Sequence, residues 1–188
     1  IPKKVVVAWL TKTQAVLCQK LTDTVAMFLK PDMGAADAHE FERRVEGLVR
    51  ELARSFEEWC FNSLEPQKVE AMPQHVEHLG QKCRRLKKKT RHANVLSRFG
   101  NITLTRATYR QGSRGRTIAP LEKILGIECG ATPGAQDLVG RQVAAAGSSQ
   151  GRCIDVIAER TGARIGPEKL RNLSSHLAEI MEPQREAC

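Results

Sequence analysis

The segment AADAHEFERRVEGLVRELARSFEEWCFNSL, residues 35–64, decides the fold of the amino-terminal part of the chain. Its large apolar residues recur at steps of three and four, which predicts a long amphipathic helix with one continuous apolar stripe. The stripe consists of Phe41, Val45, Leu48, Val49, Leu52, Phe56, Trp59 and Cys60. Glutamates and arginines at helix-neighbour spacing occupy the other faces, and Pro66 ends the helix.

A second amphipathic helix is predicted just before it, over Val5–Leu29. Its apolar positions are Leu10, Leu17, Leu21, Val25 and Phe28, and Pro31 ends it. Two long helices joined by a short loop predict an antiparallel helical hairpin over residues 1–65. A two-helix core is thin. The Phe41–Trp59 face could therefore serve intramolecular packing alone or a homodimer seam, and both readings stay open.

The net charge of +9 is concentrated in the middle of the chain. Residues 1–77 carry ten basic and twelve acidic residues, and residues 122–188 carry eight and nine. Residues 78–121 carry twelve lysines and arginines and no acidic residue. Such a segment attracts a polyanion, although a solvated charge run without a partner is the alternative.

The basic segment supplies most of the candidate DNA contacts. After a linker over residues 66–80, a flexible basic run extends to residue 92 and is expected to contact phosphates. A β-hairpin follows within residues 93–130, from strands over 93–99 and 102–110 with Gly100-Asn101 at the turn. Its arginines would hold this ribbon in the major groove. The candidates are Lys82, Arg84, Arg85, Lys87, Lys88, Lys89 and Arg91 in the run, Arg98, Arg106 and Arg110 on the ribbon, and Arg114 and Arg116 in the loop after it.

A bundle of helices is predicted for residues 131–188. A short helix from Pro120 precedes it, and its own helices cover about 134–146, 150–160 and 167–181. Ala158 and Gly162 have the spacing expected at the turn of a helix-turn-helix, and the next helix offers Lys169, Arg171 and Asn172 to DNA. A plain helical bundle explains the same pattern. The predicted fold class is therefore mainly α with a small β-hairpin.

Catalytic and metal-binding signatures are not recognisable in the sequence. We find no paired carboxylates, phosphate-binding loop or nucleophilic triad, and we expect no cofactor. His75, His78, Cys83 and His92 could in principle hold zinc, but their spacing fits no compact finger and the nearby cations oppose it. No apolar run is long enough to cross a membrane. Six scattered cysteines favour reduced thiols and a cytoplasmic location.

A series of short motifs from Arg98 onward resembles the segment ahead of the catalytic domain in ISKra-type insertion-sequence transposases of bacteria. These motifs are Phe99-Gly100-Asn101-Ile102, Arg106, Tyr109-Arg110, Pro120-Leu121-Glu122, Leu125-Gly126-Ile127, Gly130-Ala131-Thr132-Pro133, Gln150 and Lys169-Leu170-Arg171. The helix around Phe41–Leu64 is similar to the start of such proteins. Many relatives carry cysteine pairs beside the hairpin. Here Cys83 stands alone before it and Gln111-Gly112-Ser113 follows it, which implies that zinc is not bound.

The resemblance implies a transposase that cuts and joins DNA with an Asp-Asp-Glu set on a ribonuclease-H-like domain. That domain would begin after Met181, so this chain would be the binding and assembly part, without catalytic residues. The leading expectation is binding to transposon-end DNA that weakens steeply with salt. The alternatives are a helical interaction or dimerisation module with a basic tether, and a binder of structured RNA.

Overall fold

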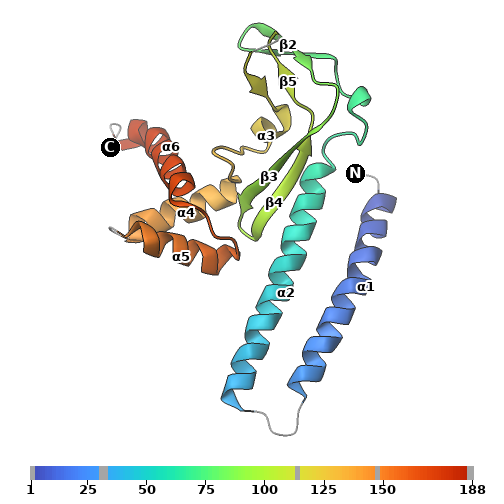
Figure 1. The fold of residues 1–188 in the computed structure, drawn as a ribbon, viewed down its shortest axis with the longest axis vertical. Coiled ribbons are helices and arrows are strands. Elements are labelled where there is room, and N and C mark those ends of the chain that lie inside the picture. The colour runs from blue at the N-terminus through green and yellow to red at the C-terminus, as the bar shows by residue number, and fades with distance from the viewer. Residues whose placement is uncertain (1–2, 30–33, 113–114, 147–148, 186–188) are drawn as a thin grey trace.

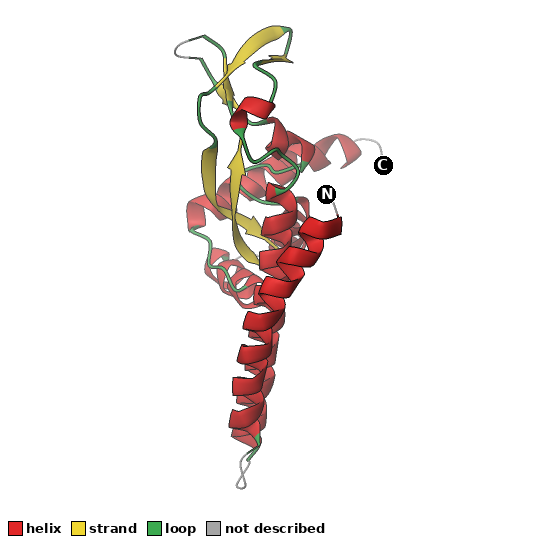
Figure 2. Cartoon of the chain, turned by 90° about the vertical axis from the view of Figure 1, so that its right-hand side faces the viewer, coloured by secondary structure: helices red, strands yellow, loops and turns green. Residues whose placement is uncertain are grey.

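The computed structural model of the chain describes residues 3–29, 34–112, 115–146 and 149–185. Its fold is mixed, with helices predominating and two small antiparallel sheets: β3–β4 lies between the helical hairpin and the carboxy-terminal helices, and the other sheet lies beyond the end of the hairpin (Figures 1 and 2). The elements in chain order are α1 (Lys3–Phe28), α2 (Ala35–Asn62), a 3-10 turn (Val69–Ala71), β1 (His75–His78), β2 (Gln81–Arg85), β3 (Thr90–Ser97), β4 (Gly100–Arg106), β5 (Tyr109–Arg110), β6 (Thr117–Ile118), α3 (Pro120–Ile124), α4 (Pro133–Ala146), α5 (Gln150–Thr161) and α6 (Pro167–Arg185).

The two long helices α1 and α2 lie antiparallel as a hairpin that projects from the rest of the molecule (Figure 1). Aromatic pairs join the helices near both ends. The ring centroids of Trp9 and Trp59 lie 5.3 Å apart, and those of Phe28 and Phe41 lie 4.2 Å apart. The Phe41–Trp59 face of α2 is therefore used for packing within the chain.

The face of α1 that contacts α2 differs from the predicted apolar stripe. Trp9 and the buried Thr24 face α2. Leu10, Leu21 and Val25 belong to the predicted stripe, yet they are 49%, 40% and 44% exposed. The sequence period correctly predicts the helix, but the aromatic anchors at its two ends set its rotation and turn part of its apolar surface outward.

The last two turns of α2 cover the free edge of strand β4. Glu58 and Asn62 lie about one turn apart at the end of the helix, and Glu65 follows the helix by three residues. Their side chains form hydrogen bonds with the backbone of alternate residues from Thr103 to Ala107. The bonds are Thr103 N–H to Glu58 Oε2 (2.8 Å), Asn62 Nδ2 to the Thr103 carbonyl (2.9 Å), Thr105 N–H to Asn62 Oδ1 (2.7 Å) and Ala107 N–H to Glu65 Oε2 (2.7 Å). These side chains take the place of a neighbouring strand.

The first sheet is the hairpin β3–β4, and its turn differs from the prediction. Ser97 pairs with Gly100, so Arg98-Phe99 forms the turn and Gly100-Asn101 already belongs to β4. Gly100 has φ 123°, a backbone conformation that favours glycine and lets β4 begin directly after the turn. Val95, Ile102 and Leu104 pack beneath the hairpin against Ile127, Phe61 and Leu125.

A second sheet has four short strands in the order β1-β2-β5-β6, and its first two strands lie in the region predicted to be a linker and basic run. The prediction of an irregular linker over residues 66–80 is therefore wrong for His75–His78. The two-residue turn at Leu79-Gly80 has positive φ at both positions, 51° and 72°, as a tight hairpin requires. Tyr109-Arg110 pairs with β2 and β6, not with the strand before residue 100.

The carboxy-terminal helices α4, α5 and α6 pack against one another. Ala135 and Val139 of α4 pack with Ile157 of α5 and with Leu170 and Leu173 of α6. The α5 helix ends at Gly162 with φ 74°, near the predicted turn. None of the helices in the described ranges is long and apolar enough to span a bilayer.

Candidate nucleic-acid interface

Three of the cations expected to contact DNA make contacts within the fold. The Lys89 ammonium lies 3.2 Å from Glu65, and their side chains are 12% and 5% exposed. Arg106 Nε lies 2.6 Å from Glu122 Oε1. Arg85 donates to the carbonyl oxygens of Glu70 and Met72, which fixes the 3-10 turn beside β2. These side chains hold the fold together and are not available to a ligand.

The partners of these cations come from outside the acid-free segment, which is why the sequence did not reveal them. Glu65 lies three residues after α2, and Glu122 lies on α3. Glu122 also contacts His92 Nδ1, so a single carboxylate joins β3, β4 and α3. Residues 78–121 contain no acidic residue, but the fold brings Glu65 and Glu122 from outside this segment next to its cations.

The β3–β4 ribbon is not free to enter a DNA groove. Side chains at the end of α2 cover the edge of β4, and the turn around Gly130 covers the edge of β3. Leu96 N–H donates to the Gly130 carbonyl (2.8 Å), and Thr132 N–H donates to the Leu96 carbonyl (2.9 Å). The Arg98 side chain lies against the start of α4, because a Cβ on Gly134 would come within 2.9 Å of its Cδ. The ribbon predicted to read a groove is thus fixed to the scaffold along both edges, although part of β3 stays exposed.

The second sheet presents the remaining cations on its outer face. We define the outer face of the sheet as His75, Glu77, Lys82, Arg84, Arg110 and Thr117. Alternation along the strands turns their neighbours inward, where Cys83, Tyr109 and Ile118 pack with Val69 and Ala107. The Tyr109 ring is fully buried, its hydroxyl donates to the Pro73 carbonyl (3.1 Å), and burial raises its pKa. Tyr109 is therefore not a stacking platform for bases.

Arg84 and Arg110 stand directly opposite each other on neighbouring antiparallel strands. Such a pair of like charges destabilises a sheet unless an anion lies between or above them. Arg110 Nε donates weakly to Thr117 Oγ1 (3.4 Å), and within the described residues neither arginine forms an ion pair. Lys82 lies two residues along the same strand, opposite Glu77.

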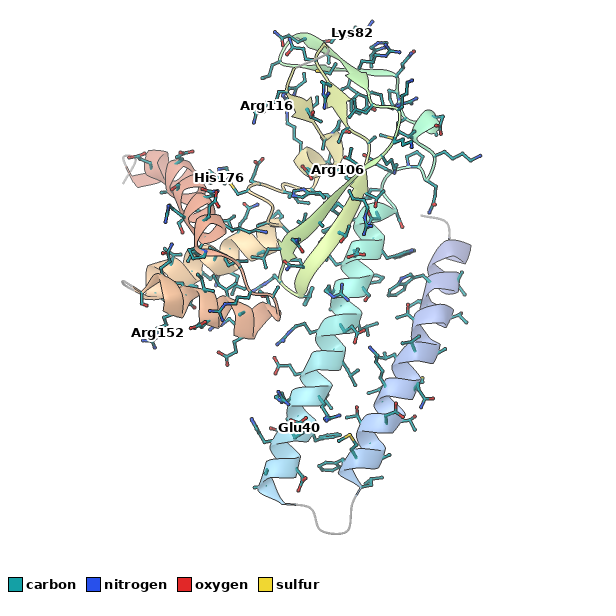
Figure 3. The ribbon with its side chains drawn as sticks, in the orientation of Figure 1. Glu40, Lys82, Arg106, Arg116, Arg152 and His176 are labelled. Carbon is teal, nitrogen blue, oxygen red and sulfur yellow. The ribbon has the colours of Figure 1, made fainter. Side chains whose placement is uncertain are left out.

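Other predicted contacts surround this face or lie apart from it. Lys87, Lys88, Arg91 and Arg116 are exposed, and Arg114 lies outside the described residues. Figure 3 places Lys82 and Arg116 at the sheet end of the molecule, far from Glu40 near the tip of the helical hairpin. Part of the predicted set of DNA-contacting residues thus lies together at the end of the molecule formed by the second sheet.

The candidates on α6 form a separate group. Lys169 Nζ donates to the Asn94 carbonyl (2.8 Å), and burial lowers its pKa, so this side chain fastens α6 to β3. Arg171 and Asn172 are exposed at the start of the helix. Leu170 and Leu173 face the bundle core. Only two of the three predicted contacts on this helix are thus open to a ligand.

The candidate zinc ligands do not converge. His75 and Cys83 lie on neighbouring strands but on opposite faces of the sheet, since Cys83 pairs with Val76. His92 lies on β3 and contacts Glu122. In the parts of the chain that the structure describes, no three histidine, cysteine or acidic side chains are placed to share a metal ion. The five cysteines in those parts are unpaired thiols.

Comparison with known proteins gives no match for this chain. No family model, no curated protein and no solved structure is significantly similar to it.

Proposed function

We propose that this chain is the DNA-binding, non-catalytic part of a transposase-like protein, and that the outer face of the sheet binds the phosphate backbone. The supporting observation is the distribution of counter-charges. Several exposed cations on the helices have carboxylate partners within 3 Å, namely Lys20, Arg43, Arg44 and Arg141. Arg84 and Arg110 have no such partner among the described residues and face each other. A bound phosphate would supply the missing charge.

The geometry suits contact with phosphates rather than reading of bases. Directly opposed residues on antiparallel strands have Cβ atoms about 5 Å apart, so two guanidinium groups can approach one phosphate. Lys82 on the face and Lys87 and Lys88 beside it would meet neighbouring phosphates. Such contacts position a protein on nucleic acid without specifying sequence. Arg171 and Asn172 at the start of α6 would add a second point of contact, where base edges could be read.

The test compares two variants that lose the same charge. One carries Lys82→Gln, Arg84→Gln and Arg110→Gln. The control carries Arg43→Gln, Arg44→Gln and Arg141→Gln, which removes three exposed arginines paired with glutamate or aspartate on the helices. Binding to a duplex is measured by fluorescence anisotropy across a salt series. Each lost phosphate contact lowers the slope of log K against log salt by about 0.9, so we expect the slope of the sheet variant to fall by roughly 3.

The control should keep the slope of the wild-type chain. Equal slopes for the wild-type chain and both variants would show that the outer face of the sheet does not bind DNA. Binding that does not change with salt would contradict phosphate binding anywhere on the chain. Competition between duplex DNA and a structured RNA of the same length distinguishes the two nucleic acids. Preference for the RNA would favour the alternative of a structured-RNA binder.

The transposase assignment rests on the resemblance of the sequence alone, and we propose no catalytic role for this part. Its test is the coding DNA beyond Cys188, where an in-frame continuation should encode an Asp-Asp-Glu set. The alternative of a helical interaction module is tested by measuring the size of the chain with and without duplex. If the chain binds no duplex and is a dimer both with and without DNA, the result would favour the interaction module.

A further inference from the structure

Four side chains on the outer face of the sheet form one row that crosses all four of its strands. His75 of β1 pairs with Arg84 of β2. Arg84 also pairs with Arg110 of β5, and Arg110 pairs with Thr117 of β6. Directly paired residues of antiparallel strands point to the same side of a sheet, so an imidazole, two guanidinium groups and a hydroxyl stand side by side. We define these four residues as the cross-strand row.

The cross-strand row is open to a ligand along its length. His75, Arg84 and Thr117 are exposed, and Arg110 is half-buried. Neighbouring strands lie about 4.8 Å apart, so His75 and Arg110, which are two strands apart, are separated by about 10 Å. An open hollow of about 450 Å³ lies beside His75. A strand of nucleic acid that follows the row therefore has room to place one phosphate at the arginine pair and another at His75.

His75 is the member of the row whose charge changes near neutral pH, because histidine titrates between about pH 5 and 8 while arginine stays charged. The charged groups that surround it on the outer face are Arg84 directly opposite, Arg110 beyond it, and Glu77 and Lys82 in the next row. Glu77 is paired with Lys82, which offsets its charge. Among the described residues His75 forms no ion pair with a carboxylate. A protonated His75 therefore adds a third positive charge to the row.

We propose that His75 is a proton-dependent phosphate contact, so that the cross-strand row binds the phosphate backbone of nucleic acid more tightly as pH falls through the range in which histidine titrates. This inference rests on the proposed binding of phosphate by the outer face of the sheet, and it adds the regulation of that site. In the free chain Arg84 opposes a charge on His75, whereas a bound phosphate favours it. Binding and protonation therefore strengthen each other by the same factor.

The test measures binding of the full chain to a DNA duplex by fluorescence anisotropy across a salt series, at about pH 5.5 and about pH 8. One added phosphate contact steepens the slope of log K against log salt by about 0.9, which at about 0.1 M salt corresponds to roughly eightfold tighter binding. The wild-type chain should show both differences at the lower pH, and His75→Gln should lose them. The matched control is His78→Gln, which removes a histidine from the same strand but from its other face. It should keep both differences.

A second variant tests the role of His75 by a gain of affinity, which a misfolded chain cannot produce. His75→Lys carries its charge at both pH values. At about pH 8 it should therefore bind the duplex roughly eightfold more tightly than the wild-type chain, with a slope steeper by about 0.9. Circular dichroism checks that His75→Gln, His75→Lys and His78→Gln keep the fold.

The results distinguish failure of this inference from failure of the proposed function. If the triple variant Lys82→Gln, Arg84→Gln and Arg110→Gln keeps the wild-type slope at about pH 8, the outer face does not bind DNA and both ideas fail. If the triple variant loses slope while His75→Gln keeps the pH dependence of the wild-type chain, only the role of His75 is overturned. Equal losses of pH dependence in His75→Gln and His78→Gln would overturn it as well, as would His75→Lys binding no more tightly than the wild-type chain at the higher pH.

Discussion

Two neighbouring lysines, Lys88 and Lys89, should separate binding from folding when each is replaced by methionine. Their sequence context is nearly the same, yet Lys88 is exposed and Lys89 is inserted beside Glu65. Methionine keeps most of the side-chain length and removes the charge. Lys89→Met therefore leaves the Glu65 carboxylate nearly buried without its cation, whereas Lys88→Met removes a charge from solvent.

The expected cost of Lys89→Met follows from the geometry of the pair. Breaking a buried ion pair by removing one partner costs about 3–5 kcal/mol. Glu65 keeps the hydrogen bond from Ala107 N–H at 2.7 Å, which places the effect near the lower limit, about 3 kcal/mol. For a chain of this length, 1 kcal/mol lowers the melting temperature by about 2–4 °C. The melting temperature of Lys89→Met should thus fall by about 6–12 °C.

Urea unfolding followed by circular dichroism measures the stability of both variants, and the salt dependence of duplex binding measures their function. Lys88→Met should unfold within about 0.5 kcal/mol of the wild-type chain, since exposed charges contribute little to stability. If Lys88 contacts phosphate, its salt slope should fall by about 0.9, while folded Lys89→Met should keep the original slope. Equal stability of the two variants would refute the structural role of the Lys89–Glu65 pair.

Three further substitutions test other parts of the structure. Asn62→Ala removes two hydrogen bonds to the backbone of β4 and should lower the free energy of unfolding by about 2 kcal/mol in urea titrations. The exposed Gln67→Ala, the control, should leave the free energy of unfolding unchanged. Equal free energies for the two variants would show that α2 does not support the strand edge. Burial raises the pKa of Glu57, so the folded chain binds its proton more tightly than the unfolded chain, and this group makes stability fall as pH rises from about 4.5 through the raised pKa. Glu57→Gln should flatten that part of the curve and stabilise the chain at neutral pH, and an unchanged pH profile would contradict the assignment. Arg84→Gln should raise the melting temperature slightly by relieving its repulsion from Arg110, most clearly at low salt; a loss of stability would mean that the two arginines are held by contacts other than phosphate.

Helices were predictable from the sequence because their signals are local. The period of three and four and the prolines at 31, 66 and 167 place α1, α2 and α6 within a few residues of where the structure has them. The rotation of α1 was not predictable in the same way. It depends on Trp9 meeting Trp59 and Phe28 meeting Phe41, contacts between residues far apart in the chain.

The small sheet and the sorting of the cations depend on contacts that no local pattern reveals. Strands β5 and β6 have two residues each, too few for a period, and β2 lies within a basic run that reads as flexible. Arg106 and Lys89 look the same as Arg84 in sequence. The fold distinguishes them by bringing Glu122 and Glu65 to the first two from outside the acid-free segment.

The capping of β4 by helix side chains also constrains how the chain can be divided. An uncovered strand edge exposes unpaired peptide groups, which recruit strands from other molecules. A fragment beginning after Glu65 would keep the β3–β4 hairpin and lose Glu58, Asn62 and Glu65 together. The peptide groups of Thr103 and Thr105 would then have no hydrogen-bond partners on that edge. Such a fragment is expected to aggregate. The helical hairpin therefore keeps the β region from self-association, and it cannot be removed without exposing the edge of β4.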